Sequence, residues 1–437
     1  MGQEAVGIRS TETETLMRIT LIGLNYKPEV TGIAPYTADV AEGLSERGHD
    51  IHVVTGFPHY PQWAPDPRYA GPTIEETVDG VHVTRHRHYV PGSMTVTQRA
   101  HLELSFGTRV ARSRIPASDV VVCVSPALVS TGLVMARLKA QPFRPAVGVW
   151  VQDLYSRGVI ETGTMHGSSA SATTNLESGI LRAADGVAVI HRRFADHAHT
   201  ALRVPESKLS VIPNWTHMPY RPSMSRDHAR DLLGWPRDSV IALHSGNMGL
   251  KQGLENVVEA ARESDRRGGP VKFVLMGDGN QREMLEELGA GITCLTFVRS
   301  LPEKEFRAAL DAANVLLVNE RPEVSEMAVP SKLTAYFGSG SPVLAATAAG
   351  SVTDQEVRSA GAGMRVDPAD PAGLVEGVIA LAADPERSAQ LVQSGNCYLQ
   401  HNMSRAVAMD RFEKWVHTLA AAHPTRARTA SSARLGV

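Results

Sequence analysis

Short apolar runs that alternate with amphipathic helical patterns fill most of the 437-residue sequence and constrain its fold. Runs of this kind are typical of parallel strands that helices cover on both faces. In the first half they lie at 18–23, 51–54, 120–124, 147–151, 187–190 and 209–212. The pattern then restarts, with runs at 240–247, 272–279, 292–297, 315–318 and 342–346. The sequence therefore predicts an α/β protein made of two doubly wound, Rossmann-like domains.

The domain boundary is expected near 214–230, where Pro219 and Pro222 interrupt any regular element. A last helix, at about 404–421, shows an apolar face with Phe412 and Trp415. The two ends of the chain are polar and without period, so both are expected to be disordered. The expected parts are a disordered extension (1–16), an N-terminal domain (17–218), a C-terminal domain (219–400), the last helix (401–421) and a disordered tail (422–437).

Charge, cysteine content and hydropathy exclude several functional classes. The net charge of −2 gives no basic field for nucleic acid. The three cysteines are far apart and no zinc-binding spacing occurs. No run approaches the roughly 18 apolar residues of a membrane span, and the start lacks the features of a signal peptide. We expect a cytoplasmic protein; the alternative is peripheral contact with the inner face of a membrane through arginines between 85 and 114.

Two facing doubly wound domains form a cleft between the carboxyl ends of their strands, so the loops that follow strands are the candidate binding segments. The first is "NYKPEVTGIAPY" (25–36), where Gly32 allows close backbone approach and Pro35 suits a first helical turn. A strand, a glycine loop and a helix start together favour an anion. The alternative is a tight turn that binds nothing, and the absence of GxGxxG argues against a dinucleotide.

Three segments of the second half carry similar signals. In "SGNMGLKQGLENV" (245–257), Gly246 and Gly249 permit inward amides, and Lys251 could neutralise a phosphate. "MGDGNQREML" (276–285) is another glycine loop. In "VPSKLTAYFGSG" (329–340), Lys332 stands in a first helical turn, where the helix dipole opposes a cation unless an anion is bound. The alternatives are plain turns and surface or structural lysines.

In the first half, "TGFPHYPQW" (55–63) follows a strand, and its two prolines would stiffen His59, Tyr60 and Trp63 into a platform. "WVQDLYSRG" (150–158) also follows a strand and would present Asp153 to the cleft. No two aspartates are separated by a single residue, so the D-x-D metal clamp of other nucleotide-sugar enzymes is missing and no metal is expected. Three histidines at 82, 86 and 88 share one strand face, have no carboxylate or cysteine at metal-binding spacing, and are expected on the surface.

These motifs, in this order, resemble the retaining glycosyltransferases of family 4, which have the GT-B fold. Within that family the sequence is similar to the colanic-acid and capsule exopolysaccharide branch. The resemblance covers roughly 17–400 and rests on the segments 24–63, "VSPAL", "WVQDLY", "VIPNW", "SGNMGLKQGLENVVEAA", "MGDG" and "VPSKLTAYFGSGSPV".

The resemblance implies transfer of a sugar, with retention, from a nucleoside diphosphate sugar, most simply a UDP-sugar, to a lipid-linked or small-molecule glycan acceptor. It implies no cofactor and no nucleic-acid partner, and a last helix that packs back on the N-terminal domain. His59 and Asp153 would be the catalytic residues, and Tyr60 and Trp63 would bind the acceptor. The donor would be held by Gly32, Gly246, Asn247, Gly249, Lys251, Gln252, Gly277, Asp278, Glu323, Glu326, Pro330, Ser331 and Lys332.

The sequence departs from the family pattern at the expected ribose contact. The paired glutamates of the family would fall on Met327 and Ala335, and alanine cannot accept a hydrogen bond from a ribose hydroxyl. Either Glu323 or Glu326 replaces that contact, or backbone and water hold the ribose. The departure keeps two alternatives open: a nucleotide-sugar 2-epimerase, and a sugar-nucleotide-binding protein with a degenerate site.

Overall fold

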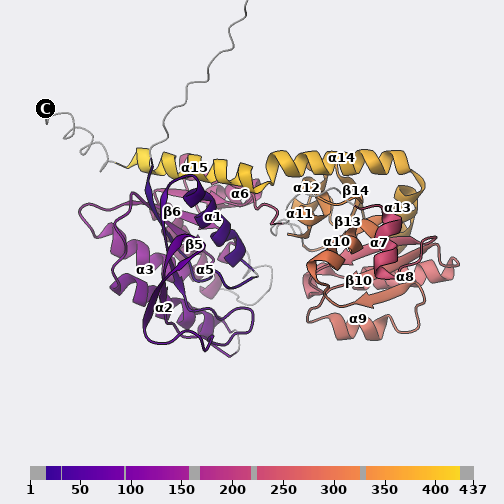
Figure 1. The fold of residues 1–437 in the computed structure, drawn as a ribbon, viewed down its shortest axis with the longest axis horizontal. Coiled ribbons are helices and arrows are strands. Elements are labelled where there is room, and N and C mark those ends of the chain that lie inside the picture. The colour runs from indigo at the N-terminus through magenta and orange to yellow at the C-terminus, as the bar shows by residue number, and fades with distance from the viewer. Residues whose placement is uncertain are drawn as a thin grey trace, which may run out of the picture.

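The structure is a computed structural model that describes residues 16–30, 32–92, 95–156, 168–217, 224–324 and 331–423. The two predicted disordered ends lie almost wholly outside these ranges. Two α/β domains stand side by side, each with its own sheet, and the last helices run along the top of both (Figure 1). This arrangement confirms the predicted fold class.

The N-terminal sheet has eight strands in the order β3-β4-β2-β1-β5-β6-β7-β8, and only the β3–β4 pair is antiparallel. The strands are β1 (Arg18–Ile22), β2 (Asp50–Gly56), β3 (Thr73–Val78), β4 (Val81–His86), β5 (Val120–Ser125), β6 (Ala146–Val151), β7 (Gly186–Val189) and β8 (Leu209–Val211). β1, β5, β6 and β7 are buried along nearly their whole length, which explains why they read as unbroken apolar runs.

Helices cover both faces of this sheet. One face packs against α1 (Ala34–Glu46) and the C-terminal helix α15 (Arg405–Ala422). The other face packs against α2 (Val96–Arg112), α3 (Leu128–Lys139), α5 (Ser168–Ala183) and α6 (Arg192–Thr200). The two hydrophobic cores leave only the edges of the sheet open, and the loops at its carboxyl edge are free to carry a site.

The C-terminal sheet has six parallel strands in the order β11-β10-β9-β12-β13-β14, a doubly wound arrangement. Its strands are β9 (Val240–Ser245), β10 (Val271–Met276), β11 (Leu295–Val298), β12 (Val315–Asn319), β13 (Val343–Ala346) and β14 (Gly363–Val366). The helices are α7 (Arg226–Leu233), α8 (Glu255–Arg266), α9 (Arg282–Leu288), α10 (Glu303–Ala312), α11 (Lys332–Phe337), α12 (Val352–Ala360), α13 (Pro371–Ala383) and α14 (Pro385–Asn402).

Every apolar run predicted as a strand overlaps one, and β4 is the strand on which the three histidines were expected, but β3 and β14 were missed. β3 and β14 are only partly buried along their length, so neither gives a continuous apolar signal. A turn signal for the β3–β4 hairpin was nevertheless present: Asp79 and Gly80 both adopt positive φ, 49° and 83°, as a two-residue Asp-Gly turn requires. The surface prediction for the nearby histidines was wrong for two of the three, because His86 and His88 are buried beside α2.

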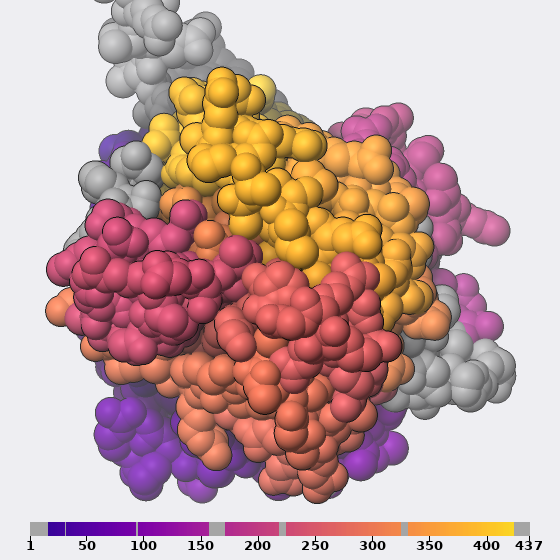
Figure 2. Space-filling view, turned by 90° about the vertical axis from the view of Figure 1, so that its right-hand side faces the viewer, coloured from indigo at the N-terminus to yellow at the C-terminus, as the bar shows by residue number. Residues whose placement is uncertain are grey.

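The last two helices join the domains. α14 lies over the C-terminal domain, and α15 crosses to the N-terminal one (Figure 1). Figure 2 looks onto the C-terminal domain and shows the last described helices, in yellow, along its upper side. Where the chain passes between the domains, the Thr216 amide donates to the Met403 carbonyl at 2.9 Å.

Aromatic packing and buried charge fix α15 to the first domain. Phe412 is fully buried and meets Trp150 edge to face at 5.0 Å between ring centroids. A side chain at Gly148, in the middle of β6, would lie 2.8 Å from Trp415, so this glycine makes room for the helix. At the helix edge, Glu413 accepts a hydrogen bond from His49 Nε2 at 2.9 Å. The predicted returning helix therefore completes a core that the N-terminal segment cannot close by itself.

Replacing Phe412 by alanine should lower the free energy of unfolding by about 3–5 kcal/mol, because it leaves a large cavity between α15 and the sheet. Lys414→Ala is the matched control, since Lys414 is exposed on the same helix and should change stability by less than about 0.5 kcal/mol. Urea unfolding followed by tryptophan fluorescence measures both variants. Equal midpoints for the two would show that α15 contributes little to the core.

Candidate active site

A buried carboxylate in the loop after β1 organises the loop after β2. Glu29 is only 6% exposed, and its Oε1 accepts hydrogen bonds from the backbone amides of His59 at 2.8 Å and Tyr60 at 2.9 Å. Its Oε2 accepts from Asn25 Nδ2 at 2.9 Å. Gly32, in the left-handed region at φ 67°, lies against the Tyr60 ring. The unusual first loop therefore holds the predicted acceptor loop in place, a role that sequence reasoning missed.

His59 is held as a neutral imidazole. Its Nδ1 lies 3.0 Å from the Phe57 carbonyl, which can only accept, so Nδ1 carries the proton and Nε2 keeps a lone pair. Burial lowers the pKa of His59 below its ordinary value, against the opposing effect of that hydrogen bond. The rings of His88 and Trp63 pack against His59, at 4.8 and 5.7 Å between centroids. Such a group can accept a proton or a hydrogen bond from an acceptor hydroxyl.

Asp153 lies just after β6 and is open to solvent. The protein on its other sides removes water from the carboxyl group and raises its pKa, while the Leu154 amide, Lys251 and Arg99 act in the opposite direction. Lys251 belongs to the C-terminal domain, so its charge acts on Asp153 across the two domains. The Lys251 carbonyl accepts from the Arg321 amide at 3.0 Å, whereas its side chain, which is partly covered, has no hydrogen-bond or ion-pair partner among the described residues.

A buried polar network lies behind Asp153 and carries residues that the sequence did not single out. The Arg99 guanidinium contacts both Glu103 and the Tyr155 hydroxyl, and Tyr155 donates to Glu103 in turn. Glu177 accepts from the amides of Tyr155 at 2.8 Å and of the following residue at 3.0 Å. These bonds connect α2 and α5 to the segment after β6 and fix the backbone that presents Asp153.

In the C-terminal domain, the loops after β9 and β10 lie directly against each other. The Gly246 amide donates to the Met276 carbonyl at 2.8 Å, and the Met248 amide donates to the Asp278 carbonyl at 2.9 Å. A Cβ at Gly277 would stand 2.0 Å from the Gly246 carbonyl oxygen, and Gly277 has φ 133°. Glycine is therefore required where the two predicted donor loops touch.

Side chains within the first of these loops fix its shape. Gln252 Oε1 accepts from the Gly249 amide at 3.0 Å, and the Asn247 amide group lies over Gly249. Asn319, at the end of β12, donates from Nδ2 to the carbonyls of Gln252 and Gly253, both at 2.8 Å. These bonds fix the shape of the predicted donor loop, while Gly246 and Asn247 remain exposed at the edge of the sheet.

Lys332 reaches the same edge from α11. Its Nζ lies 3.2 Å from His244 Nε2 and 3.8 Å from the position that a Cβ on Gly246 would occupy. Burial lowers the pKa of Lys332 to about 7, and Glu320 opposes that shift. The prediction that Lys332 belongs with the glycine loop in space is consistent with this geometry, and its imidazole partner was not expected.

The remaining predicted donor residues divide into three groups. Glu323 and Ser331 are exposed on either side of the segment 325–330, and Glu326 and Pro330 fall in that segment, outside the described residues. Asp278 is exposed, but its carboxylate is occupied by Ser300 and Arg299. Ala335 packs its methyl group against the second core of the domain.

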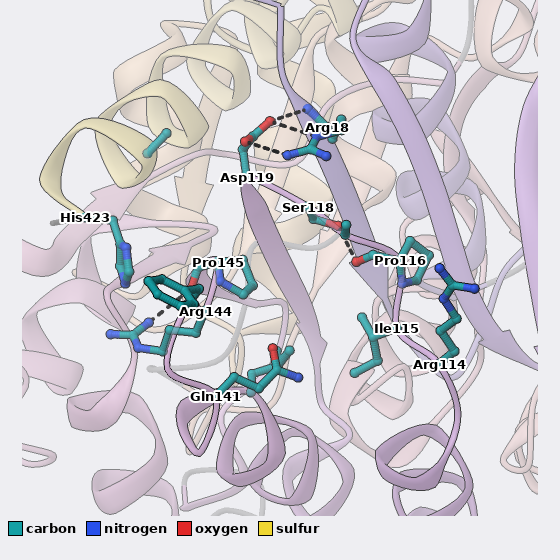
Figure 3. A pocket seen from close by; sticks show the side chains of 14 residues that line it. Arg18, Arg114, Ile115, Pro116, Ser118, Asp119, Gln141, Arg144, Pro145 and His423 are labelled. Carbon is teal, nitrogen blue, oxygen red and sulfur yellow. Dashed lines mark hydrogen bonds and ion pairs between the residues drawn. The ribbon is translucent and has the colours of Figure 1, made fainter. Parts of the chain in front are cut away.

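A cavity of about 440 Å³ lies away from this region, at the amino ends of β1, β5 and β6 (Figure 3). Arg18 and Asp119 pair at its rim at 3.2 Å, and Arg144 pairs with Asp185 at 2.6 Å. Because these charges neutralise each other and the cavity is at the opposite edge of the sheet, it takes no part in the candidate site.

One group of three potential metal ligands occurs among the described residues: His49, Glu413 and His417. His49 Nδ1 accepts from the Met17 amide at 3.2 Å, so its proton is on Nε2, which donates to Glu413. A protonated Nε2 has no lone pair for a metal, and the arrangement serves to dock α15 instead. The prediction of a metal-independent site stays a prediction.

The fold and the two facing loop sets define a class: enzymes with the GT-B fold that handle nucleotide sugars between two Rossmann-like domains. Residues 31–215 match the family described as "Glycosyl transferase 4-like domain", and residues 239–384 match "Glycosyl transferases group 1". The chain therefore belongs to the glycosyltransferases with the GT-B fold.

Among curated relatives, the chain is 29% identical over 339 residues to the putative colanic acid biosynthesis glycosyl transferase WcaI of Escherichia coli K12. The match covers 74% of this chain and 82% of that protein. D-inositol 3-phosphate glycosyltransferase 1 of Catenulispora acidiphila is 26% identical, over 82% of this chain and 83% of the relative. These matches favour sugar transfer over epimerisation.

Solved structures share the fold at low sequence identity. Sucrose-phosphate synthase from Thermosynechococcus elongatus superposes with a TM-score of 0.67 at 19% identity, covering 92% of this chain and 99% of that one. HepE from Anabaena, solved in complex with UDP-glucose, gives a TM-score of 0.63 at 14% identity, covering 93% and 100% of the two chains.

Glu29→Ala should leave the amides of His59 and Tyr60 without a buried acceptor, at a cost of about 1–3 kcal/mol for each group. We expect a large loss of transferase activity with unchanged nucleotide affinity, because the contacts of Glu29 lie in the N-terminal domain. Glu29→Gln keeps one acceptor oxygen and should lose less. Turnover and calorimetric nucleotide binding, measured on the same preparations, separate the effects; a weakened nucleotide affinity would contradict the assignment.

Proposed function

We propose that this glycosyltransferase transfers a sugar from a UDP-sugar to a hydroxyl group of a glycan acceptor, with retention of anomeric configuration, in the assembly of an extracellular polysaccharide or a related glycoconjugate. The observation that carries the proposal is the meeting of two glycine loops and two lysines at the carboxyl edge of the C-terminal sheet. Exposed amides and cations are the groups that bind a diphosphate and stabilise the charge it gains on leaving.

The UDP part of the proposal is supported by analogy. The HepE structures contain UDP-glucose or UDP in a protein of the same fold. The exopolysaccharide part rests on the similarity to WcaI, a putative colanic acid enzyme.

The N-terminal domain supplies the acceptor side in this proposal. His59 offers a lone pair on Nε2, and Asp153 stands opposite Lys251. Tyr60 and Trp63, edge to face at 5.4 Å, offer aromatic surface to a sugar ring. Attack from the face that the diphosphate leaves would give retention, and closure of the domains would exclude water from the reacting centre.

The test is a donor screen followed by an activity assay. The purified chain is mixed with UDP-, GDP- and dTDP-sugars, and thermal stabilisation identifies the donor. Release of the nucleotide is then followed with lipid-linked and soluble glycan acceptors, with and without EDTA, because the sequence lacks a D-x-D pair. NMR of the product assigns the anomeric configuration. Isomerised donor sugar without transfer would favour an epimerase, and binding without turnover a degenerate site.

Substitutions in the N-terminal domain should lower the rate of sugar transfer, and substitutions in the C-terminal domain should lower the affinity for the donor. His59→Ala and Asp153→Asn should reduce transfer by about a hundredfold or more while the Kd for UDP stays within twofold, because a lost general base or acceptor contact acts on chemistry. Lys251→Ala should instead raise the donor Kd by about tenfold or more, through the loss of a charge-assisted phosphate contact. Calorimetry with UDP gives the affinities. Weaker UDP binding in the His59 variant would contradict this division.

The ribose contact is expected to come from the segment before α11. Glu323 is exposed and has no partner among the described residues, so it is available to bind a ribose diol. Glu323→Ala should raise the donor KM by about tenfold, or about 1.4 kcal/mol. Ala335→Glu should then add little. If Ala335→Glu tightens donor binding and Glu323→Ala has no effect, Glu323 does not bind the ribose.

A further inference from the structure

Two titratable side chains, His244 and Lys332, meet beneath the predicted donor loop, and the charge of a third, Glu320, acts on Lys332. His244 closes β9 and is completely buried. Lys332 comes from α11, and its Nζ contacts His244 Nε2 at 3.2 Å. Glu320 follows β12, is 9% exposed, and accepts a hydrogen bond from Thr353 of α12 at 2.9 Å. The Lys332 side chain is partly exposed at the edge of the sheet, but its amine contacts the imidazole of His244 inside the protein.

The other charges near this cluster are already paired. Arg321 pairs with Glu255 at 3.1 Å, and Asp354 of α12 pairs with Arg358 at 2.7 Å. The Tyr336 hydroxyl of α11 accepts from the Ser245 amide at 2.8 Å. Among the described residues, His244 and Glu320 are therefore the titratable groups that act on the Lys332 amine.

Near neutral pH, the His244–Lys332–Glu320 cluster is only partly protonated. Burial lowers the pKa of His244 well below its ordinary value, and the neighbouring Lys332 lowers it further, so the imidazole is neutral. Burial lowers the pKa of Lys332 to about 7 and raises that of Glu320 to about 7. A diphosphate bound at Gly246 brings negative charge close to the cluster. Negative charge raises the pKa of every nearby group, so the cluster can only gain protons when the diphosphate binds.

We propose that His244 is a positioning residue that holds the Lys332 amine beside Gly246, and that the His244–Lys332–Glu320 cluster takes up a proton from solvent when a nucleoside diphosphate binds. The proton adds to the neutral Lys332 amine, and the resulting ammonium donates to the phosphate. The inference rests on the proposed donor site and deepens it. His244 acts through Lys332 and does not itself touch the ligand.

Calorimetric titration of UDP into the full-length protein tests the proposal. Titrations at pH 8 in Tris and in HEPES, at one ionic strength, give the number of protons bound from the dependence of the observed enthalpy on the buffer. UDP is fully ionised at that pH, since the last pKa of a phosphate monoester is about 6. We expect uptake of about one proton at pH 8 and less at pH 7, where much of the cluster already holds its proton.

Variants assign the effect to named groups. Lys332→Met should abolish proton uptake and weaken UDP binding. His244→Phe fills the same space without an acceptor atom, and should weaken UDP about tenfold and remove most of the uptake. His244→Gln restores an acceptor oxygen and should recover both. Lys251→Ala is the matched control: it should weaken UDP yet keep the uptake, because Lys251 is not part of the buried cluster. Thermal unfolding verifies that each variant is folded.

The outcomes distinguish this inference from the proposed function. UDP binding without proton uptake in the wild-type protein, at both pH values, would overturn the inference and leave the donor site standing. Equal proton uptake in wild-type protein and Lys332→Met would also overturn it. If neither UDP nor another nucleoside diphosphate binds, the proposed function itself fails, and this inference fails with it.

Discussion

Burial of both faces of two parallel sheets is the constraint on which the rest of the structure depends. Helices occupy the faces, so only the edges of the sheets are open, and at the carboxyl edges successive loops converge. The N-terminal sheet cannot cover one of its faces from its own segment and uses α15, which arrives after the whole C-terminal domain. Because α15 follows the C-terminal domain in the sequence and packs on the N-terminal sheet, this single helix links the two domains that carry the predicted site.

The proposed acceptor side, in the N-terminal domain, and the proposed donor side, in the C-terminal domain, are organised by different electrostatic interactions. On the proposed acceptor side, the buried carboxylate of Glu29 accepts from two backbone amides and from the Asn25 side chain, and burial lowers the pKa of the His59 imidazole. On the proposed donor side, burial lowers the pKa of Lys332 beside the His244 imidazole and so disfavours its charged form. In the proposal made above, Lys332 becomes charged only when an anionic ligand is bound beside it, so the domain does not carry the cost of an unpaired buried ammonium.

Sequence patterns predicted the elements whose signal is local. Continuous apolar runs predicted the central strands, and glycines in βα loops predicted segments that do lie together, such as Gly246 and Gly277. Features that depend on long-range partners were not predicted. Glu29 was an ordinary polar residue in a loop, and its partners are 30 and 31 positions away. His244 appeared only as part of an apolar run, because nothing in the local pattern distinguishes a buried imidazole that meets a lysine 88 positions later.

The fold shows what surrounds Ala335, the position at which the family pattern has a glutamate. The methyl group of Ala335 packs against the core that includes Leu333 and Tyr336, and Tyr336 in turn fixes the end of β9 through Ser245. The helix α11 is therefore held by its apolar face and by the Tyr336 hydroxyl, independently of any ligand contact at 335. Loss of a ribose carboxylate need not disturb the phosphate end of the site, where Lys332 and the glycine loops are positioned by their own contacts. In the proposed donor site, the residues that would select the nucleoside and those that would bind the diphosphate are therefore held by separate sets of contacts.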